Sequence, residues 1–196
     1  MNSQRILKII KFIIVLGMPA ILSSLAQAAE TYKLDPAHTS IVFRVKHLGI
    51  SYVYGRINGP TGTFVFDESS PSKSAIEVQV ETKNVDTAVE KRDTLLKEPD
   101  FFNAGDHPTI SFKSKSVKRL KEAVYEVSGD LTFLGKTRPI TIEVRDSGAG
   151  KDPWGGFRRG FETYFTIKRS DFGMDFMMGG VSDEVNLTVS VEGIRQ

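Results

Sequence analysis

Apolar and polar residues alternate along most of the chain from residue 31 to its end. Residues 76–81 (IEVQVE) are the clearest stretch. A period of two is typical of β-strands that are buried on one face. Comparable stretches lie at residues 41–46, 64–66, 110–112, 125–133, 140–144, 161–167 and 185–191. Because turn-forming residues separate these stretches, the pattern predicts an all-β domain of about eight to ten strands.

One segment breaks the alternation. Residues 88–97 (AVEKRDTLLK) are typical of a short helix, with Asp86 or Thr87 placed to cap its start and Pro99 to end it. The lack of further helices between the strands argues against a parallel β-α-β architecture. The strands must instead close into a barrel or stack as a sandwich to protect their edges. A barrel of this size has either a packed interior or room for one ligand, and both stay open here.

The first 28 residues differ from the rest. Three basic residues precede a short apolar stretch, and residues 26–28 (AQA) match a signal-peptidase cleavage pattern. We therefore predict a secretory signal peptide, cleaved after Ala28, and a single exported domain at residues 29–196. The leader holds three of the 26 basic residues and none of the 24 acidic ones, so the domain is nearly neutral. This balance gives no electrostatic basis for binding nucleic acid.

Candidate groups for catalysis are few. The chain has no cysteine, which excludes thiol nucleophiles, zinc–thiolate sites and disulfides. Its histidines are His38, His47 and His107, and no two of them have the spacing of metal ligands. His38 lies near Asp35 in the sequence and is expected to make hydrogen bonds within a turn. An exported enzyme acting on a lipid-like substrate would need one of these histidines or a carboxylate as its general base.

Two loops carry conspicuous aromatic residues. Trp154 is followed by Arg158 and Arg159, and we expect the indole to fold over the barrel edge with both arginines solvated. A loop that touches a membrane surface is the alternative.

Phe101 and Phe102 follow the predicted helix in a connection that is not a strand, so both need to be buried against other side chains. Either they plug or rim one end of a barrel, or they belong to its ordinary packing.

A further segment resembles part of a phosphate-binding loop but lacks its first glycine. Residues 135–137 (GKT) instead predict a β-hairpin with Lys136 and Thr137 in its turn.

Five segments in order resemble the YceI-like family of bacterial, lipocalin-like, polyisoprenoid-binding proteins. The resemblance covers residues 31–196, and residues 152–156 and 191–194 indicate its periplasmic branch. One departure lies at residues 175–180 (DFMMGG), which are richer in Met and Phe than the family pattern; flexible thioethers lining a tunnel would widen its ligand tolerance. The five segments are residues 32–49 (from YKLDPAHTS to VKHLG), 92–112 (RDTLLKEPDFFNAGDHPTISF), 129–141 (GDLT and GKTRPIT), 169–174 (RSDFGM) and 182–185 (SDEV).

The resemblance implies a single extended antiparallel β-barrel with a long apolar tunnel. It implies periplasmic, non-enzymatic binding, transport or storage of a polyisoprenoid, such as a quinone-type lipid or its precursor, without catalytic residues, metal or cofactor. A homodimer and transient contact with a membrane surface stay open. So does a ligand-free packed barrel that acts by protein contact. The residues expected to line the tunnel are Phe43, Val45, Phe64, Phe66, Val78, Val80, Phe101, Phe102, Ile110, Phe112, Leu131, Phe133, Phe161 and Phe165.

Overall fold

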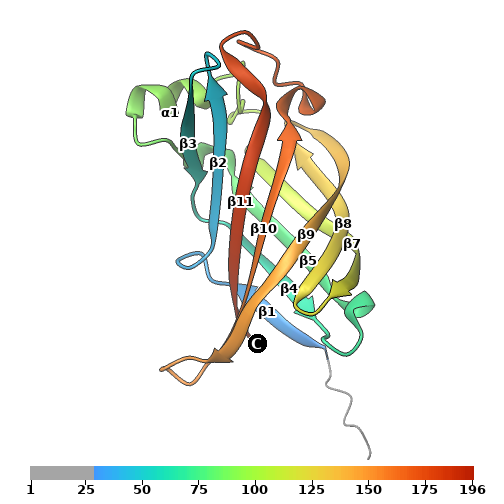
Figure 1. Cartoon of the computed structure of the whole chain (residues 1–196). Coiled ribbons are helices and arrows are strands. Elements are labelled where there is room, and N and C mark those ends of the chain that lie inside the picture. The colour runs from blue at the N-terminus through green and yellow to red at the C-terminus, as the bar shows by residue number, and fades with distance from the viewer. Residues whose placement is uncertain (1–28) are drawn as a thin grey trace, which may run out of the picture.

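The computed structural model describes residues 29–196, which form an elongated antiparallel β-barrel (Figure 1). The predicted signal peptide, residues 1–28, lies outside the described residues, so its cleavage stays a prediction. The strands are β1 (Glu30–Leu34), β2 (Ser40–His47), β3 (Ser51–Ile57), β4 (Thr61–Phe66), β5 (Ala75–Glu81), β6 (Val85–Asp86), β7 (Thr109–Lys121), β8 (Val124–Phe133), β9 (Lys136–Lys151), β10 (Phe157–Lys168) and β11 (Val181–Arg195). Three short 3₁₀ turns, η1 (Pro71–Lys73), η2 (Thr82–Asn84) and η3 (Arg169–Phe172), and one helix, α1 (Glu90–Leu96), complete the described part.

Pairing of the first strand with the last closes the barrel. Eight strands form the ring in the order β1-β4-β5-β7-β8-β9-β10-β11, and β1 pairs with both β4 and β11. Every pairing is antiparallel, and because the ring closes, the barrel is confirmed over the sandwich. Closure gives every strand of the ring a neighbour on both sides along at least part of its length, which is how an all-β domain of this size avoids edge-to-edge association. Among the described residues, no helix has the length and apolar character needed to span a bilayer.

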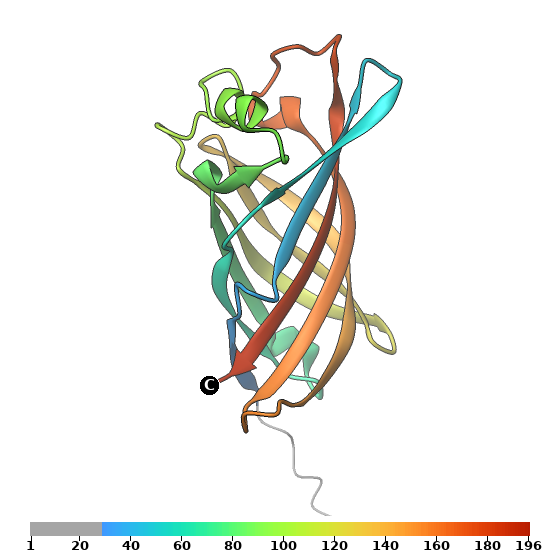
Figure 2. The ribbon, with the colours of Figure 1, turned by 90° about the vertical axis from the view of Figure 1, so that its left-hand side faces the viewer.

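A hairpin extends the barrel at one end. Strand β2 pairs with residues 181–190 of β11, beyond the part that β1 occupies, and β3 pairs with β2. The two-residue strand β6 pairs with β3 and leads into α1. Figures 1 and 2 both place the tip of the β2–β3 hairpin, α1 and the loop before β11 at the same end of the barrel, here called the α1 end.

The helix is shorter than predicted and starts differently. Its N-cap is Val89, which makes no side-chain capping hydrogen bond, so the prediction that Asp86 or Thr87 caps the helix was wrong. Ala88 has a φ of +62°, which takes the chain out of the helical conformation at that point. The Asp86 carboxylate instead accepts a hydrogen bond from the Ala88 N–H at 2.8 Å, and Thr87 bonds to Asp93.

The turn between β8 and β9 also lies elsewhere than predicted. Its two residues are Leu134 and Gly135, with φ of +49° and +69°. Lys136 and Thr137 are already paired in the sheet, opposite Phe133 and Thr132. Two consecutive positive φ values give the turn the twist of the flanking strands, which is why two-residue hairpins favour this geometry.

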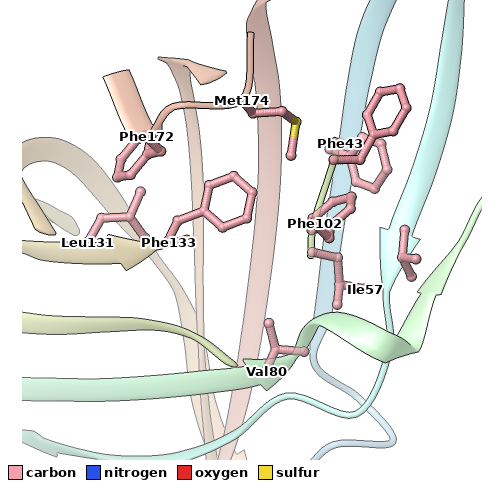
Figure 3. Packing of buried hydrophobic residues seen from close by; sticks show 10 residues of the cluster. Phe43, Ile57, Val80, Phe102, Leu131, Phe133, Phe172 and Met174 are labelled. Carbon is pink, nitrogen blue, oxygen red and sulfur yellow. The ribbon is translucent and has the colours of Figure 1, made fainter. Parts of the chain in front are cut away.

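Buried side chains form two clusters, one toward each end. At the α1 end, side chains of β2, β8, the connection after α1 and the segment from η3 to Met174 converge, among them Phe43, Phe102, Phe133 and Met174 (Figure 3). The second cluster is built around Tyr32, and partly buried Phe112 packs against both. The remaining members of the second cluster are Leu34, Phe64, Phe66, Val117, Tyr125, Val127, Phe161 and Val191.

Candidate functional site

The barrel interior holds a cavity of about 500 Å³. Small-molecule sites in proteins have volumes of roughly 300–1,000 Å³ and are mostly apolar. Most of the residues that line this cavity are apolar side chains from the barrel strands, together with residues of α1 and of the connection after it. The cavity is therefore of a size and character suited to a hydrophobic small molecule.

Inward-facing side chains reveal that the barrel is not filled. Val45, Val78, Ile110, Phe112 and Phe165 all line the cavity, yet each is only half-buried. An apolar side chain inside a close-packed core would have almost no accessible surface. These five side chains keep surface because they face empty space in the barrel, which argues against the ligand-free packed barrel.

All fourteen residues that the sequence predicted for the tunnel line this one cavity. Their role in binding a lipid stays a prediction. The prediction omitted the inward residues of β9 and β11, although the same alternation marks them. They include Ile140, Ile142, Val144, Val185, Leu187, Val189 and Val191.

A row of side chains crosses the middle of the barrel wall. Val78 pairs with Phe112 between β5 and β7, and Phe112 pairs with Leu131 between β7 and β8. A side chain at Gly129 would meet the Phe112 ring at 2.6 Å, so this glycine leaves room for the ring inside the barrel. Since Phe112 contacts both core clusters, this row lies between them.

Phe101 and Phe102 lie at the α1 end of the cavity. The Phe102 ring is 5.5 Å from that of Phe133 and 6.4 Å from that of Phe43, and Phe101 contacts Phe176 edge-on at 5.4 Å. Figure 3 shows Phe102 between side chains of different elements. Met177, from the Met-rich segment at residues 175–180, also lines the cavity here.

Aromatic rings pack against one another at the opposite end of the barrel. Tyr32 stacks on Phe64 at 4.7 Å, and Phe161 meets Phe64 and Phe66 at 5.4 and 5.2 Å. Burial, with a smaller contribution from the hydrogen bond to Glu30, raises the pKa of the Tyr32 hydroxyl to about 12. The hydroxyl therefore stays neutral and donates a hydrogen bond to the Glu30 carboxylate.

Ion pairs cover this end from outside. Arg158 lies 2.6 Å from both Asp35 and Glu192 and 2.9 Å from Asp152. Arg159 pairs with Asp146 at 2.9 Å. Both arginines are thus largely buried among carboxylates, and the prediction that they are solvated was wrong.

The prediction for the tryptophan of the same loop was wrong as well. Trp154 is 79% exposed, so its indole does not fold over the barrel edge. Two of the three acidic partners of Arg158, Asp35 and Glu192, lie far away in the sequence, so local composition did not indicate how these side chains would pack.

The side-chain ligand atoms of Asp35, His38 and Glu192 lie close enough to one another to hold a metal ion. The positive charge between the Asp35 and Glu192 carboxylates is that of Arg158, because one of its nitrogens contacts both of them. As predicted, His38 makes a turn hydrogen bond, to Asp35 at 2.8 Å. The Arg158 hydrogen bond, followed by that of His38, lowers the pKa of the Asp35 carboxyl to about 2. The cluster is therefore explained as an ion-pair network.

Changing Arg158 to Gln should make the protein less stable at pH 6, because Asp35 and Glu192 lose the cation that lies between them. Folding lowers the Asp35 pKa, so the ion pair stabilises the folded protein above pH of about 4. This contribution to stability is lost as pH falls toward 2. Thermal melts of both proteins should therefore converge between those values. Lys113→Gln, which breaks an exposed pair with Glu77, is the control. A difference that does not change with pH would contradict the assignment.

The three histidines do not form a catalytic group. His38 lies outside the barrel beside Asp35, and the only one that lines the cavity is His47, at the end of β2. The ring of His107 lies beneath the turn at Gly135, where an added side chain would meet it at 2.9 Å. Within residues 29–196, His38 alone is hydrogen-bonded to a carboxylate, and it is outside the cavity.

Arg169 organises the loop that precedes β11. It is 2% exposed and donates hydrogen bonds to the carbonyls of Met174, Phe176, Val181 and Ser182, at 2.8–3.1 Å. Burial lowers the pKa of its guanidinium, although Asp183 and Asp175 act in the opposite direction. Sequence reasoning gave this residue no role, and its place in the RSDFGM segment was the only signal.

Comparisons with known proteins agree with this geometry. A family model described as the YceI-like domain matches residues 32–193. A UPF0312 protein of Pseudomonas paraeruginosa is 44% identical over 185 residues, which are 93% of this chain and 96% of that protein.

Two solved structures have the same fold. BcnA of Burkholderia cenocepacia superposes with a TM-score of 0.74 at 21% identity, covering 81% of this chain and 98% of that one. A polyisoprenoid binding domain from Saccharophagus degradans, implicated in plant cell wall breakdown, superposes with a TM-score of 0.66 at 13% identity, covering 84% and 98%. At these identities the likeness establishes the fold alone.

Proposed function

This chain belongs to the YceI-like family, and from this premise we propose that it binds a long-chain polyisoprenoid inside its barrel, as a carrier or store. The ligand class is a quinone-type lipid or a precursor of one. A structural neighbour is described as a polyisoprenoid binding domain, which supports this class of ligand.

The unfilled apolar cavity is the observation that carries the proposal. It runs between two clusters of buried side chains, and its inward aliphatic and aromatic residues retain accessible surface. An isoprenoid tail would cover that surface without requiring a specific polar contact. Tail length and width, more than the head group, would then determine which lipids are retained.

The energetics permit such binding. Micromolar affinity needs about 8 kcal/mol, which at roughly 25 cal/mol per Å² corresponds to roughly 350 Å² of buried apolar surface. Association costs of several kcal/mol raise this requirement. A chain of many isoprene units has surface enough for both.

Several polar side chains that line the cavity have hydrogen-bond partners within the protein. Arg92 donates to the Thr87 hydroxyl and carbonyl, Thr163 donates to the Glu143 carbonyl, and Arg169 donates to four carbonyls. In the described part of the chain, no buried side-chain nitrogen or oxygen lacks a hydrogen-bond partner. We therefore propose a binding protein without catalytic residues or a cofactor, in preference to an enzyme acting on a lipid-like substrate.

We also propose a periplasmic location after export. The basic start, short apolar stretch and cleavage pattern of residues 1–28 support it. A lipid with a long apolar tail cannot cross an aqueous compartment unaided, so a barrel that encloses the tail would serve transfer there.

Solvent extraction and mass spectrometry of the protein purified from its native periplasm test the proposal. We expect an isoprenoid in roughly equal amount to the protein. Protein that is well folded by thermal melting but carries no lipid above background would contradict it. Extraction of protein refolded from denaturant is the control for lipid acquired during lysis.

A further inference from the structure

Exposed apolar side chains gather at the α1 end of the barrel. Leu48 and Ile50 form the tip of the β2–β3 hairpin, and Phe176, Met177 and Met178 lie in the loop before β11. Ile50 is 83% exposed and the other four are between 41% and 58% exposed. We call these five residues the apolar rim. Scattered apolar residues on a surface are ordinary, but a contiguous group of this kind indicates an interaction site.

The two parts of the rim are held together. The Leu48 N–H donates to the carbonyl of Gly180 at 2.8 Å, and the Gly180 N–H donates to that of Met177 at 2.9 Å. Figures 1 and 2 agree in placing the hairpin tip and this loop side by side. The rim is therefore one surface, built from segments more than a hundred residues apart.

The cavity lies directly behind the rim. Met177 lines the cavity and is nearly half exposed, and the same holds for Leu95 of α1. The Phe176 ring contacts Phe101, which also lines the cavity. At these positions single side chains separate the cavity from solvent. At the opposite end, by contrast, aromatic rings pack against one another and ion pairs lie outside them.

The hairpin behind the rim is basic. Residues 40–57 contain Arg44, Lys46 and Arg56 and no acidic residue. On its outer face, Tyr52 and Tyr54 are exposed, and the Arg44 guanidinium lies 4.5 Å from the centre of the Tyr52 ring. An apolar tip bordered by tyrosines and cations is typical of protein segments that insert shallowly into membranes with anionic lipids.

This charge distribution argues for a membrane in place of a second copy of the chain. In a symmetric dimer through this hairpin the same patch would face itself, and its like charges would repel. The loop at the other end also carries an exposed aromatic residue, Trp154, but the neighbouring Arg158 and Arg159 are neutralised by carboxylates. Among residues 29–196, only the α1 end combines exposed apolar groups with a basic surface next to the cavity.

We infer that the apolar rim and the β2–β3 hairpin dock the protein on a bilayer surface containing anionic phospholipids. Docked in this way, the α1 end would face the membrane, and a lipid tail would enter or leave the cavity past Leu95 and Met177. The role of docking in loading rests on the proposed function; the docking itself does not depend on it.

Flotation with lipid vesicles tests the inference, using protein purified from its native source. The vesicles contain phosphatidylcholine with about one third phosphatidylglycerol, or phosphatidylcholine alone. Replacing both rim residues of the hairpin, Leu48→Ser with Ile50→Ser, should lower the bound fraction about tenfold, because it removes the inserted apolar surface. Lys46→Gln with Arg56→Gln should lower it about fivefold or more, and only on vesicles with phosphatidylglycerol.

Trp154→Ser is the matched control, since it removes one exposed aromatic residue at the other end. Unchanged flotation of this variant supports the inference, and a loss equal to that of the rim variant overturns it. The inference is also overturned if the wild type is a dimer and the rim variant is a monomer in analytical ultracentrifugation, because the rim would then be an interface between copies.

Failure of docking and failure of lipid binding are distinguishable in the wild-type protein. If it carries isoprenoid but does not float with either vesicle, the docking inference is wrong and the proposed function stands. If it floats but extraction finds no lipid, docking is supported and the proposed function is contradicted.

Discussion

Replacement of Phe112 with aspartate is expected to lower the isoprenoid content of the purified protein at neutral pH by about a hundredfold. The side chain lies in the row Val78–Phe112–Leu131 across the cavity wall, between the two core clusters. A carboxylate there would lose its water when an apolar tail enters, and burying an unpaired charge costs several kcal/mol. At 1.4 kcal/mol for each factor of ten, about 3 kcal/mol accounts for the loss.

The pH dependence of this variant adds a second test. Burial beside apolar groups raises the pKa of an introduced carboxyl, so acidification neutralises it. Lipid added at pH of about 4 should therefore be retained better than lipid added at neutral pH. Mass spectrometry after gel filtration at each pH measures this. A variant that holds as much lipid as the wild type at neutral pH would show that the ligand lies elsewhere.

Two controls separate charge in the cavity from damage to the fold. Phe112→Leu keeps an apolar side chain at the same position and should retain the lipid. Thr141→Asp places the same acid on β9, at an exposed position beside the inward residue Ile142, and should retain it too. Thermal melts of all three variants verify that they fold. Val78→Asp, opposite Phe112 across β5 and β7, should repeat the loss of lipid.

The inward face of the barrel was predictable because it depends on a local pattern. In a strand, successive side chains point to opposite faces, so Val78 and Val80 fix the cavity side of β5 wherever its neighbours lie. The same rule placed Phe43 and Val45 on β2. All fourteen predicted residues accordingly line one cavity. Alternation alone did not show whether that interior is filled, since this depends on how far apart opposite walls lie.

Features that depend on distant partners were not predictable in this way. Arg158 was expected to be solvated, but it pairs with Asp35, which lies 123 positions earlier in the chain. The start of α1 was missed because Ala88 takes a left-handed conformation, although its side chain favours helices. The apolar rim escaped notice for the same reason: Leu48 bonds to Gly180, and so comes next to the Met-rich loop, only once β2 and β11 have paired.

Replacing Arg169 with methionine is expected to destabilise the barrel by about 3 kcal/mol, which corresponds to a fall of roughly 6–12 °C in melting temperature for a domain of this size. The guanidinium is 2% exposed and donates to four backbone carbonyls of residues 174–182. Methionine has a similar length but no donor, so these carbonyls would be left unpaired or the loop would have to open to water.

Lysine at position 169 should recover only part of this loss. Its ammonium keeps the charge, but it is a point donor and cannot reproduce the planar fork that reaches four carbonyls at once. Arg138→Met provides the matched control: Arg138 is exposed and donates one hydrogen bond, to the carbonyl of Asp171 at 3.0 Å. We expect this control to change stability by no more than about 0.5 kcal/mol. Equal destabilisation by the two methionine variants in urea titrations would contradict the special role of Arg169.

The Arg169→Met variant also tests whether the loop before β11 takes part in the proposed membrane docking. Phe176, Met177 and Met178 are held in the rim by the segment that Arg169 anchors. At a temperature where Arg169→Met is still folded, vesicle flotation should therefore fall as it does for the Leu48→Ser, Ile50→Ser variant, while Arg138→Met floats normally. If flotation is unchanged when the loop is loosened, the hairpin alone docks, and the anchoring by Arg169 serves only the stability of the barrel.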